Sequence, residues 1–87
     1  MKWTVTVGNK ALKNLQKLSK PVKDQIDAFI LKLESLENPR ILGKSLQGNL
    51  NDYWCYRVGD YRLICEIKDN QLVVLVVAIG HRREIYR

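Results

Sequence analysis

The stretch that decides the fold is residues 53–79, YWCYRVGDYRLICEIKDNQLVVLVVAI. It contains three β-rich segments, 53–58, 61–68 and 71–79, separated by the polar pairs Gly59-Asp60 and Asp69-Asn70. Each pair has the length and composition of a two-residue hairpin turn. We therefore predict three consecutive antiparallel strands.

The first turn determines which side chains share a face of this sheet. With Gly59-Asp60 as the turn, Arg57 lies opposite Arg62 and Tyr56 lies opposite Leu63. The predicted core face then consists of Trp54, Tyr56, Val58, Tyr61, Leu63, Cys65 and Ile67. The predicted second face consists of Tyr53, Cys55, Arg57, Arg62, Ile64, Glu66, Val73, Leu75, Val77 and Ile79, with His81 next in line.

Two features of the second face suggest a binding surface. Arg57 directly opposite Arg62 is an unfavourable cross-strand pair. Ile64, Leu75 and Val77 form an apolar floor on a side that the helices do not cover, and such floors commonly receive a ligand or partner. Coverage by the 39–51 loop or by a second copy of the chain is the alternative, and the two readings are about equally supported.

The N-terminal half predicts one strand and two helices. Residues 2–7 alternate, with Trp3, Val5 and Val7 on one face. A helix follows from Lys10 with Leu12, Leu15 and Leu18 as its apolar stripe, and Pro21 suits the first turn of a second helix that ends before Pro39. That second helix carries Val22, Ile26, Phe29, Ile30 and Leu33 at helical spacing, and Leu46 anchors the loop 39–51. The predicted order βααβββ is a single α+β domain, residues 1–87, in which a two-helix hairpin packs on an antiparallel sheet of about four strands.

Composition narrows the functional classes. The 87 residues include 15 Lys plus Arg against 9 Asp plus Glu, a formal net charge of +6, which attracts nucleic acid, acidic proteins or membrane surfaces. The sequence lacks a bilayer-length apolar run and a signal-peptide core, so we expect a cytoplasmic protein. Cys55 and Cys65 fall on opposite faces, cannot form a disulfide, and with His81 as the single histidine form no metal-ligand cluster. We therefore predict no metal and no cofactor.

The C-terminal residues 80–87, GHRREIYR, hold one imidazole, three guanidinium groups and a phenol. Cleavage of RNA by its own 2′-hydroxyl needs fixed positive charge at the phosphate, a proton acceptor and a proton donor. Arginine and histidine supply these functions without a metal ion. The alternative is a basic tail that only aids solubility. Because the Arg57/Arg62 pair is predicted to lie nearby, a catalytic site and a solubilising tail are equally compatible with this segment.

The segments RVGDYRLI (57–64) and GHRREIY (80–86) together resemble the RelE/ParE toxin superfamily. Ala11-Leu12-Lys13, Asn38-Pro39-Arg40 and the short segment from Leu46 to Gly48 extend this resemblance over essentially the whole chain. It implies a microbial-RNase-like fold and cleavage of mRNA in the ribosomal A site. It also implies a RelB-type antitoxin that inhibits the toxin in a hetero-oligomeric complex and binds operator DNA. We expect the free toxin to be a monomer, with dimerisation through the exposed apolar face as the alternative.

The resemblance also implies roles for individual residues. Arg62 matches the arginine that contacts the reacting phosphate, Arg82 the transition-state stabiliser or general acid, and Tyr86 the tyrosine that orients a nucleotide. Arg57, Lys44 and Arg83 are predicted substrate contacts. Well-known RelE toxins have two lysines where this chain has Tyr53 and Cys55, and we expect Lys44 to replace part of that charge. His81 is our candidate for proton transfer.

Two other functions stay open at this point. A ParE-like toxin shares the fold and inhibits DNA gyrase without an RNase site. A catalytically silent binding module of the same fold would explain the missing lysines.

Overall fold

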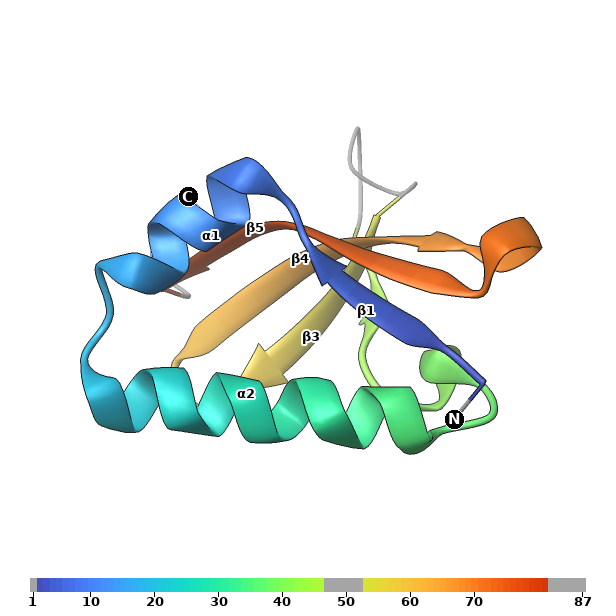
Figure 1. Ribbon diagram of the computed structural model, residues 1–87, viewed down its shortest axis with the longest axis horizontal. Helices are drawn as coiled ribbons and strands as arrows, with labels where there is room; N and C mark the ends of the chain where they lie inside the picture. Colours follow the sequence, from blue (N-terminus) through green and yellow to red (C-terminus); the bar gives the residue numbers. More distant parts are fainter. Residues whose placement is uncertain (1, 47–52, 82–87) are drawn as a thin grey trace.

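The computed structural model describes residues 2–46 and 53–81. Five strands, two helices and two short 3-10 turns follow one another in the described part (Figure 1). In chain order they are β1 (Thr4–Val7), α1 (Asn9–Gln16), α2 (Lys20–Ser35), η1 (Pro39–Ile41), β2 (Lys44–Ser45), β3 (Trp54–Val58), β4 (Tyr61–Lys68), η3 (Asp69–Gln71) and β5 (Val73–His81). Within these ranges, no helix is long and apolar enough to cross a membrane.

The five strands form one sheet in the order β1-β5-β4-β3-β2. The α+β prediction is confirmed, but two of its details were wrong. The sheet is mixed rather than antiparallel, because β1 lies parallel to β5. It also gains a fifth strand, because Lys44 and Ser45 pair with β3 inside the segment predicted as a loop. Two residues are too few to produce a periodic signal, and a strand's pairing partner is not encoded in its own alternation.

The β3–β4 hairpin follows the predicted register. Arg57 pairs with Arg62 and Tyr56 with Leu63 across a Gly59-Asp60 turn. Every predicted core-face residue belongs to the main hydrophobic cluster or packs against it. Tyr53, Cys55 and Ile64 gather on the second face in a separate small cluster, as predicted. The two cysteines therefore lie on opposite faces, and both are free thiols.

The β4–β5 connection differs from its prediction in two ways. Four residues rather than two join the strands, through η3 and Leu72 at φ 55°. This adds two residues, so the alternation of faces is preserved and Val74 and Val76 point into the core. A β-bulge then interrupts the register, because Cys65 pairs with Val76 while Ile64 pairs with Ala78.

The bulge reverses the predicted faces at the end of β5. One extra residue in a strand shifts all later side chains to the opposite side. Ile79, predicted on the second face, is consequently 4% exposed in the main core. His81 pairs with Tyr61, a core-face residue, so its prediction on the second face was also wrong.

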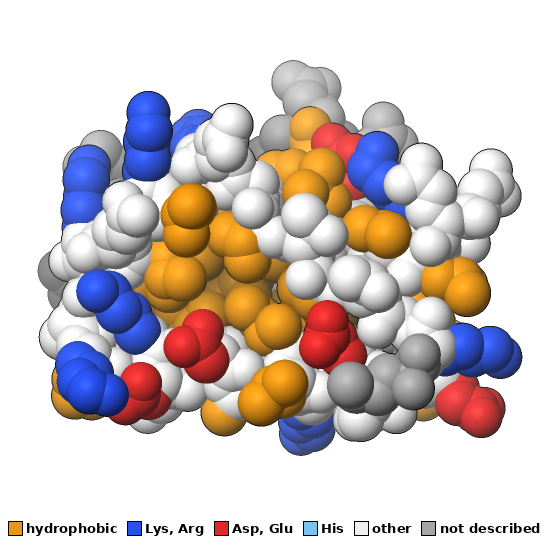
Figure 2. Space-filling view, in the orientation of Figure 1, with side chains coloured by type: hydrophobic (Ala, Val, Ile, Leu, Met, Phe, Trp, Pro, Cys, Tyr) orange, Lys and Arg blue, Asp and Glu red, His pale blue; other side chains and the backbone are white. Residues whose placement is uncertain are grey.

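The helices contact the sheet more than each other. α1 packs mainly on β5, and α2 packs on β1 and β3, so the apolar stripes of both helices meet in one core above the sheet. Ala11 rather than Leu12 is the buried residue of α1; Leu12 is 43% exposed. Figure 2 shows the consequence: apolar side chains remain visible between α1, β1 and α2. Pro21 lies in the first turn of α2, as predicted.

Candidate functional site

The described residues enclose a cavity of about 330 Å³ between α2, residues 42–44, β3 and β4. Among the residues that the structure describes, its lining contains four cationic side chains and no Asp or Glu. The lining residues are Phe29, Lys32, Leu42, Gly43, Lys44, Cys55, Tyr56, Arg57 and Arg62, and we call this space the cationic cavity. Figure 1 shows why it lies there, since the end of β3 meets the middle of α2.

Arg62 is the most buried of the four cationic residues in the lining. Only 9% of the residue is exposed, whereas Arg57 beside it is exposed. On its other side Arg62 pairs with Gly80, which has no side chain. One guanidinium N–H of Arg62 donates to the Tyr61 carbonyl at 3.5 Å. Burying a charge next to a like charge costs free energy, and a bound anion such as a phosphate offsets that cost.

Lys44 brings positive charge to the place where Cys55 departs from the RelE pattern. Lys44 and Cys55 are direct cross-strand partners in the β2–β3 register, and Lys44 is exposed. Cys55 itself is 3% exposed because Leu46 packs on it together with Ile64. A lysine at position 55 would be buried in this small cluster. Leu46 thus covers one part of the second face, Cys55 and Ile64, as the prediction of coverage by the 39–51 loop expects for that part, and the cations beside it line the cavity.

Three aromatic side chains fasten the segment that carries Lys44. Their N–H or O–H groups donate to three backbone carbonyls along residues 37–42: Trp3 Nε1 to Glu37 at 3.0 Å, Tyr56 Oη to Pro39 at 2.6 Å and Trp54 Nε1 to Leu42 at 2.7 Å. Burial raises the pKa of the Tyr56 phenol, so the group stays a protonated donor. The segment is therefore held to the sheet at three successive points.

Gly43 allows this segment to approach β3 closely. Its φ is +77°, in the left-handed region that favours glycine. A Cβ at this position would lie 2.5 Å from the Cys55 carbonyl oxygen and 2.8 Å from Trp54 Nε1. The position of Lys44, one residue later, thus depends on a residue without a side chain.

An ion pair ties the same segment to the far end of the sheet. Arg40 in η1 donates to both carboxylate oxygens of Asp69 in η3, at 2.8 and 3.0 Å. This hydrogen bonding lowers the pKa of Asp69 and raises the pKa of Arg40. The Arg40 guanidinium also lies 6.0 Å from the centre of the Trp54 ring.

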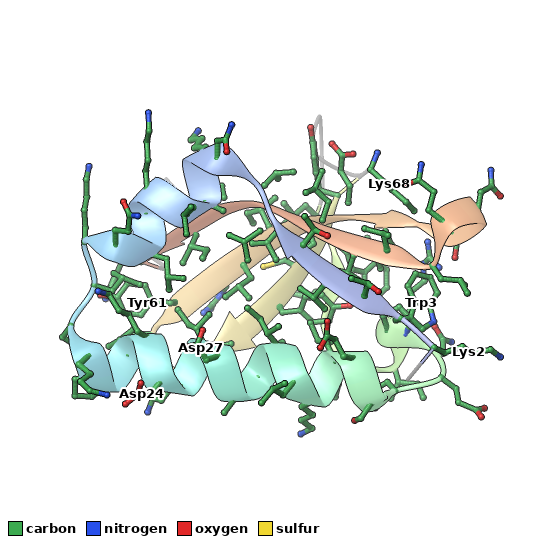
Figure 3. All side chains as sticks on the ribbon, viewed as in Figure 1. Lys2, Trp3, Asp24, Asp27, Tyr61 and Lys68 are labelled. Carbon is green, nitrogen blue, oxygen red and sulfur yellow. The ribbon has the colours of Figure 1, made fainter. Side chains whose placement is uncertain are left out.

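His81 lies at the other end of the sheet from this ion pair. Its ring meets the Tyr61 ring edge to face, with centroids 5.5 Å apart. Figure 3 shows Tyr61 at the end of the sheet near the α1–α2 connection, while Trp3 and Lys68 lie at the opposite end. Arg62 follows Tyr61 in the strand and points to the opposite face. His81 therefore lies on the core face of the sheet with Tyr61, whereas Arg57 and Arg62 lie on the second face.

The structure thus brings together three of the predicted site residues, Lys44, Arg57 and Arg62. Arg82, Arg83 and Tyr86 lie outside the described residues. Sequence reasoning missed Lys32, which α2 contributes to the cavity. Its available signal was its spacing of three residues from Phe29, since residues three apart share one side of a helix. Among residues 2–46 and 53–81, no group of three or more His, Cys, Asp or Glu side chains could hold a metal ion.

Comparison with known sequences identifies relatives over the full chain. Residues 5–86 match the family described as ParE toxin of type II toxin-antitoxin system, parDE. The chain is 32% identical to the mRNA interferase toxin RelE of Escherichia coli, over 99% of this chain and 92% of that protein. It is also 32% identical to toxin RelG of Mycobacterium tuberculosis, over 100% of this chain and 99% of that protein.

Solved structures give the same result. A RelBE toxin–antitoxin complex of Mycobacterium tuberculosis superposes with a TM-score of 0.84 at 28% identity, covering 94% of this chain and 93% of that one. A variant of Escherichia coli RelE in the free state gives 0.76 at 29% identity, covering 99% and 92%. The fold, the arginine pair and these matches agree, and the chain belongs to the ParE toxin family of type II toxin–antitoxin systems, as a RelE-type member of the RelE/ParE superfamily.

Proposed function

We propose that this protein is an mRNA interferase, an endoribonuclease that cleaves mRNA in the ribosomal A site. The main support for the proposal is the cationic cavity, where Arg57, Arg62 and Lys44 converge and the lining residues within 2–46 and 53–81 include no carboxylate. Guanidinium groups bind phosphate in two-point contacts and stabilise charge that develops on its oxygens. Relatives at 32% identity carry the name mRNA interferase RelE, which supports this chemistry over other phosphate-binding functions.

The proposed reaction needs no metal ion. The ribose 2′-oxygen forms a bond to phosphorus while the bond from phosphorus to the 5′-oxygen breaks, leaving a cyclic phosphate. One proton leaves the 2′-hydroxyl and one reaches the departing 5′-oxygen. In this scheme Arg62 holds the reacting phosphate, Arg57 and Lys44 contact the adjoining backbone, and Arg82 stabilises the transition state. Tyr86 orients the nucleotide, and Arg83 adds a further phosphate contact.

His81 is proposed as a proton-transfer group. Histidine exchanges protons near neutral pH, and His81 ends the strand that runs beside Arg62. The His81 ring contacts Tyr61 on the core face of the sheet. To reach a phosphate held by Arg62 on the second face, the ring must therefore pass around the end of β5. His81→Ala should then slow cleavage by about 10²–10⁴-fold, the usual contribution of general acid–base catalysis. Cleavage at the parent rate would remove His81 from the mechanism.

A cell-free translation reaction with a defined mRNA tests the proposal. Primer extension maps the cut positions, beside a control with the same RNA without ribosomes. Cuts confined to the translated message support A-site cleavage, and cuts in both samples indicate a ribosome-independent nuclease. No cuts, with circular dichroism showing a folded protein, would refute the proposed activity.

Gyrase inhibition is a second candidate, because the matching family is named for ParE toxins. A plasmid supercoiling assay with purified DNA gyrase separates it from the first. Inhibition of supercoiling without mRNA cleavage would favour the ParE-like function. Inactivity of a folded protein in both assays would favour the silent binding module.

A RelB-type antitoxin is the proposed partner of this toxin in the cytoplasm. Solved relatives include RelE–RelB complexes of Mycobacterium tuberculosis and Pyrococcus horikoshii. Leu12, Leu31 and Ile41 are 43%, 63% and 68% exposed, and burying such side chains drives association. A short gene beside this one that encodes an acidic protein would supply the antitoxin, and the test is co-expression of that protein with the toxin. We expect a hetero-oligomer on size-exclusion chromatography, loss of cleavage, operator DNA binding only by the complex, and a monomeric free toxin.

A further inference from the structure

We propose that Phe29 and Lys32 of α2 make the cationic cavity a pocket for one whole ribonucleotide, beside the phosphate that is cleaved. The base would lie against Phe29, and its phosphate would lie between Lys32 and Lys44. The inference deepens the proposed function, because RNA is its ligand. In this arrangement α2 contributes to nucleotide binding as well as to the core.

The walls of the cavity differ in chemistry from a simple phosphate site. Phe29 and Leu42, both half-buried, supply apolar surface, while the four cations supply charge. The Phe29 ring is held against the Tyr56 ring, with centroids 5.4 Å apart and planes at 59°. A ligand that satisfies both kinds of wall has a flat apolar part and an anionic part. A nucleotide has both, and aromatic side chains bind single-stranded bases in this way.

Within residues 2–46 and 53–81, no strand pairs with the end of β3 that lies beside α2. β2 pairs only with Trp54 and Cys55, so β3 extends beyond it toward α2. Val58 and Tyr61 flank the two-residue turn. Because hydrogen-bonded pairs alternate along a hairpin, the backbone N–H and C=O of Arg57 point away from β4, toward this edge. The cavity therefore offers directional polar groups as well as charge.

The size of the cavity fits one nucleotide. Small-molecule sites occupy roughly 300–1,000 Å³, and the cationic cavity, at about 330 Å³, lies at the small end of that range. An acidic peptide would satisfy the cations but not the aromatic wall. An acidic peptide is therefore the competing ligand against which nucleotide binding is measured.

The test is an NMR titration of the isotope-labelled toxin with a 2′-O-methyl trinucleotide, which cannot be cleaved through its 2′-oxygen. We expect the largest shifts at the amides of Gly43, Lys44 and Arg57. Lys32→Gln should weaken binding about five- to tenfold and reduce the dependence of log Kd on log salt by about 0.7, the value for one phosphate contact in a single strand. Lys10→Gln, which removes the same charge from the exposed surface of α1, should leave both quantities unchanged.

Phe29→Leu separates the base from the phosphate. It should weaken binding of the trinucleotide severalfold and leave binding of inorganic pyrophosphate unchanged. Equal losses from Lys32→Gln and Lys10→Gln would overturn the pocket, because only overall charge would then matter. Equal affinity for a tri-glutamate peptide would overturn its nucleotide character. Trinucleotide binding without cleavage of translated mRNA would refute the proposed function but leave the pocket standing.

Discussion

Replacing Gly43 with alanine tests whether the close approach of residues 42–44 to β3 builds the site. The substitution places a Cβ 2.5 Å from the Cys55 carbonyl oxygen and 2.9 Å from Tyr56 Cδ1, contacts that cannot persist without movement. It also forces alanine into the left-handed region at φ +77°. The backbone conformation costs about 1–2 kcal/mol, and overpacking costs about 1–3 kcal/mol more.

We therefore expect Gly43→Ala to lower the free energy of unfolding by about 3 kcal/mol, which in a domain of this size lowers Tm by about 12–24 °C. The assay is thermal unfolding by circular dichroism. Gly59→Ala is the matched control, because its φ is +59° but its Cβ would meet only Gln25 Oε1, at 3.6 Å. That control should cost only the backbone term, about 1–2 kcal/mol or about 4–16 °C in Tm.

The difference between the two variants isolates the steric contact. If residues 42–44 move away from β3 while the rest of the domain stays folded, Gly43→Ala will lower Tm by less. Cleavage will then be strongly reduced, because Lys44 has moved. Equal Tm for both alanine variants, with cleavage retained by Gly43→Ala, would refute the argument that this glycine positions the cavity wall.

Three further predictions follow from the same contacts. Tyr56→Phe leaves the buried Pro39 carbonyl without its 2.6 Å donor, so unfolding should become easier by about 1–2 kcal/mol, or about 5–15 °C in Tm, by calorimetry. Asp69→Asn removes a carboxylate whose pKa Arg40 lowers below the ordinary 3.8, a contribution present above that value and lost as pH falls through the folded-state pKa. The stability gap between wild type and Asp69→Asn in urea titrations should therefore close in acid, and a constant gap would contradict the pairing. Arg62→Lys keeps the charge but loses two-point phosphate binding, so primer extension should show about a hundredfold slower cleavage, and unchanged cleavage would remove Arg62 from the site.

The hairpin between β3 and β4 was predictable because its information is local. A two-residue turn and strict alternation place each side chain on a face, and both signals lie within a dozen neighbouring residues. The pairing of Arg57 with Arg62 and the separation of Cys55 from Cys65 followed directly, and the structure confirms both.

The end of β5 was not predictable for a physical reason. A bulge changes the face of every later residue, yet it leaves no consistent mark on the local sequence. The position of His81 depends on the pairing of Ile64 with Ala78, which is a property of two strands together. The parallel pairing of β1 with β5 and the approach of Lys32 to the arginine pair are likewise properties of the assembled fold.

The short segment 44–46 separates the second face of the sheet into a packed part and a cationic part. Leu46 covers Cys55 and Ile64, which are 3% and 9% exposed, whereas Leu75 and Val77 on the same face stay half-buried. The cationic part keeps the exposed Arg57 opposite the buried Arg62, and like charges directly opposite each other on paired strands are unfavourable. A phosphate placed between them turns the same repulsion into attraction for the ligand, so the least favourable pair in the hairpin is also the strongest structural argument for an anionic substrate.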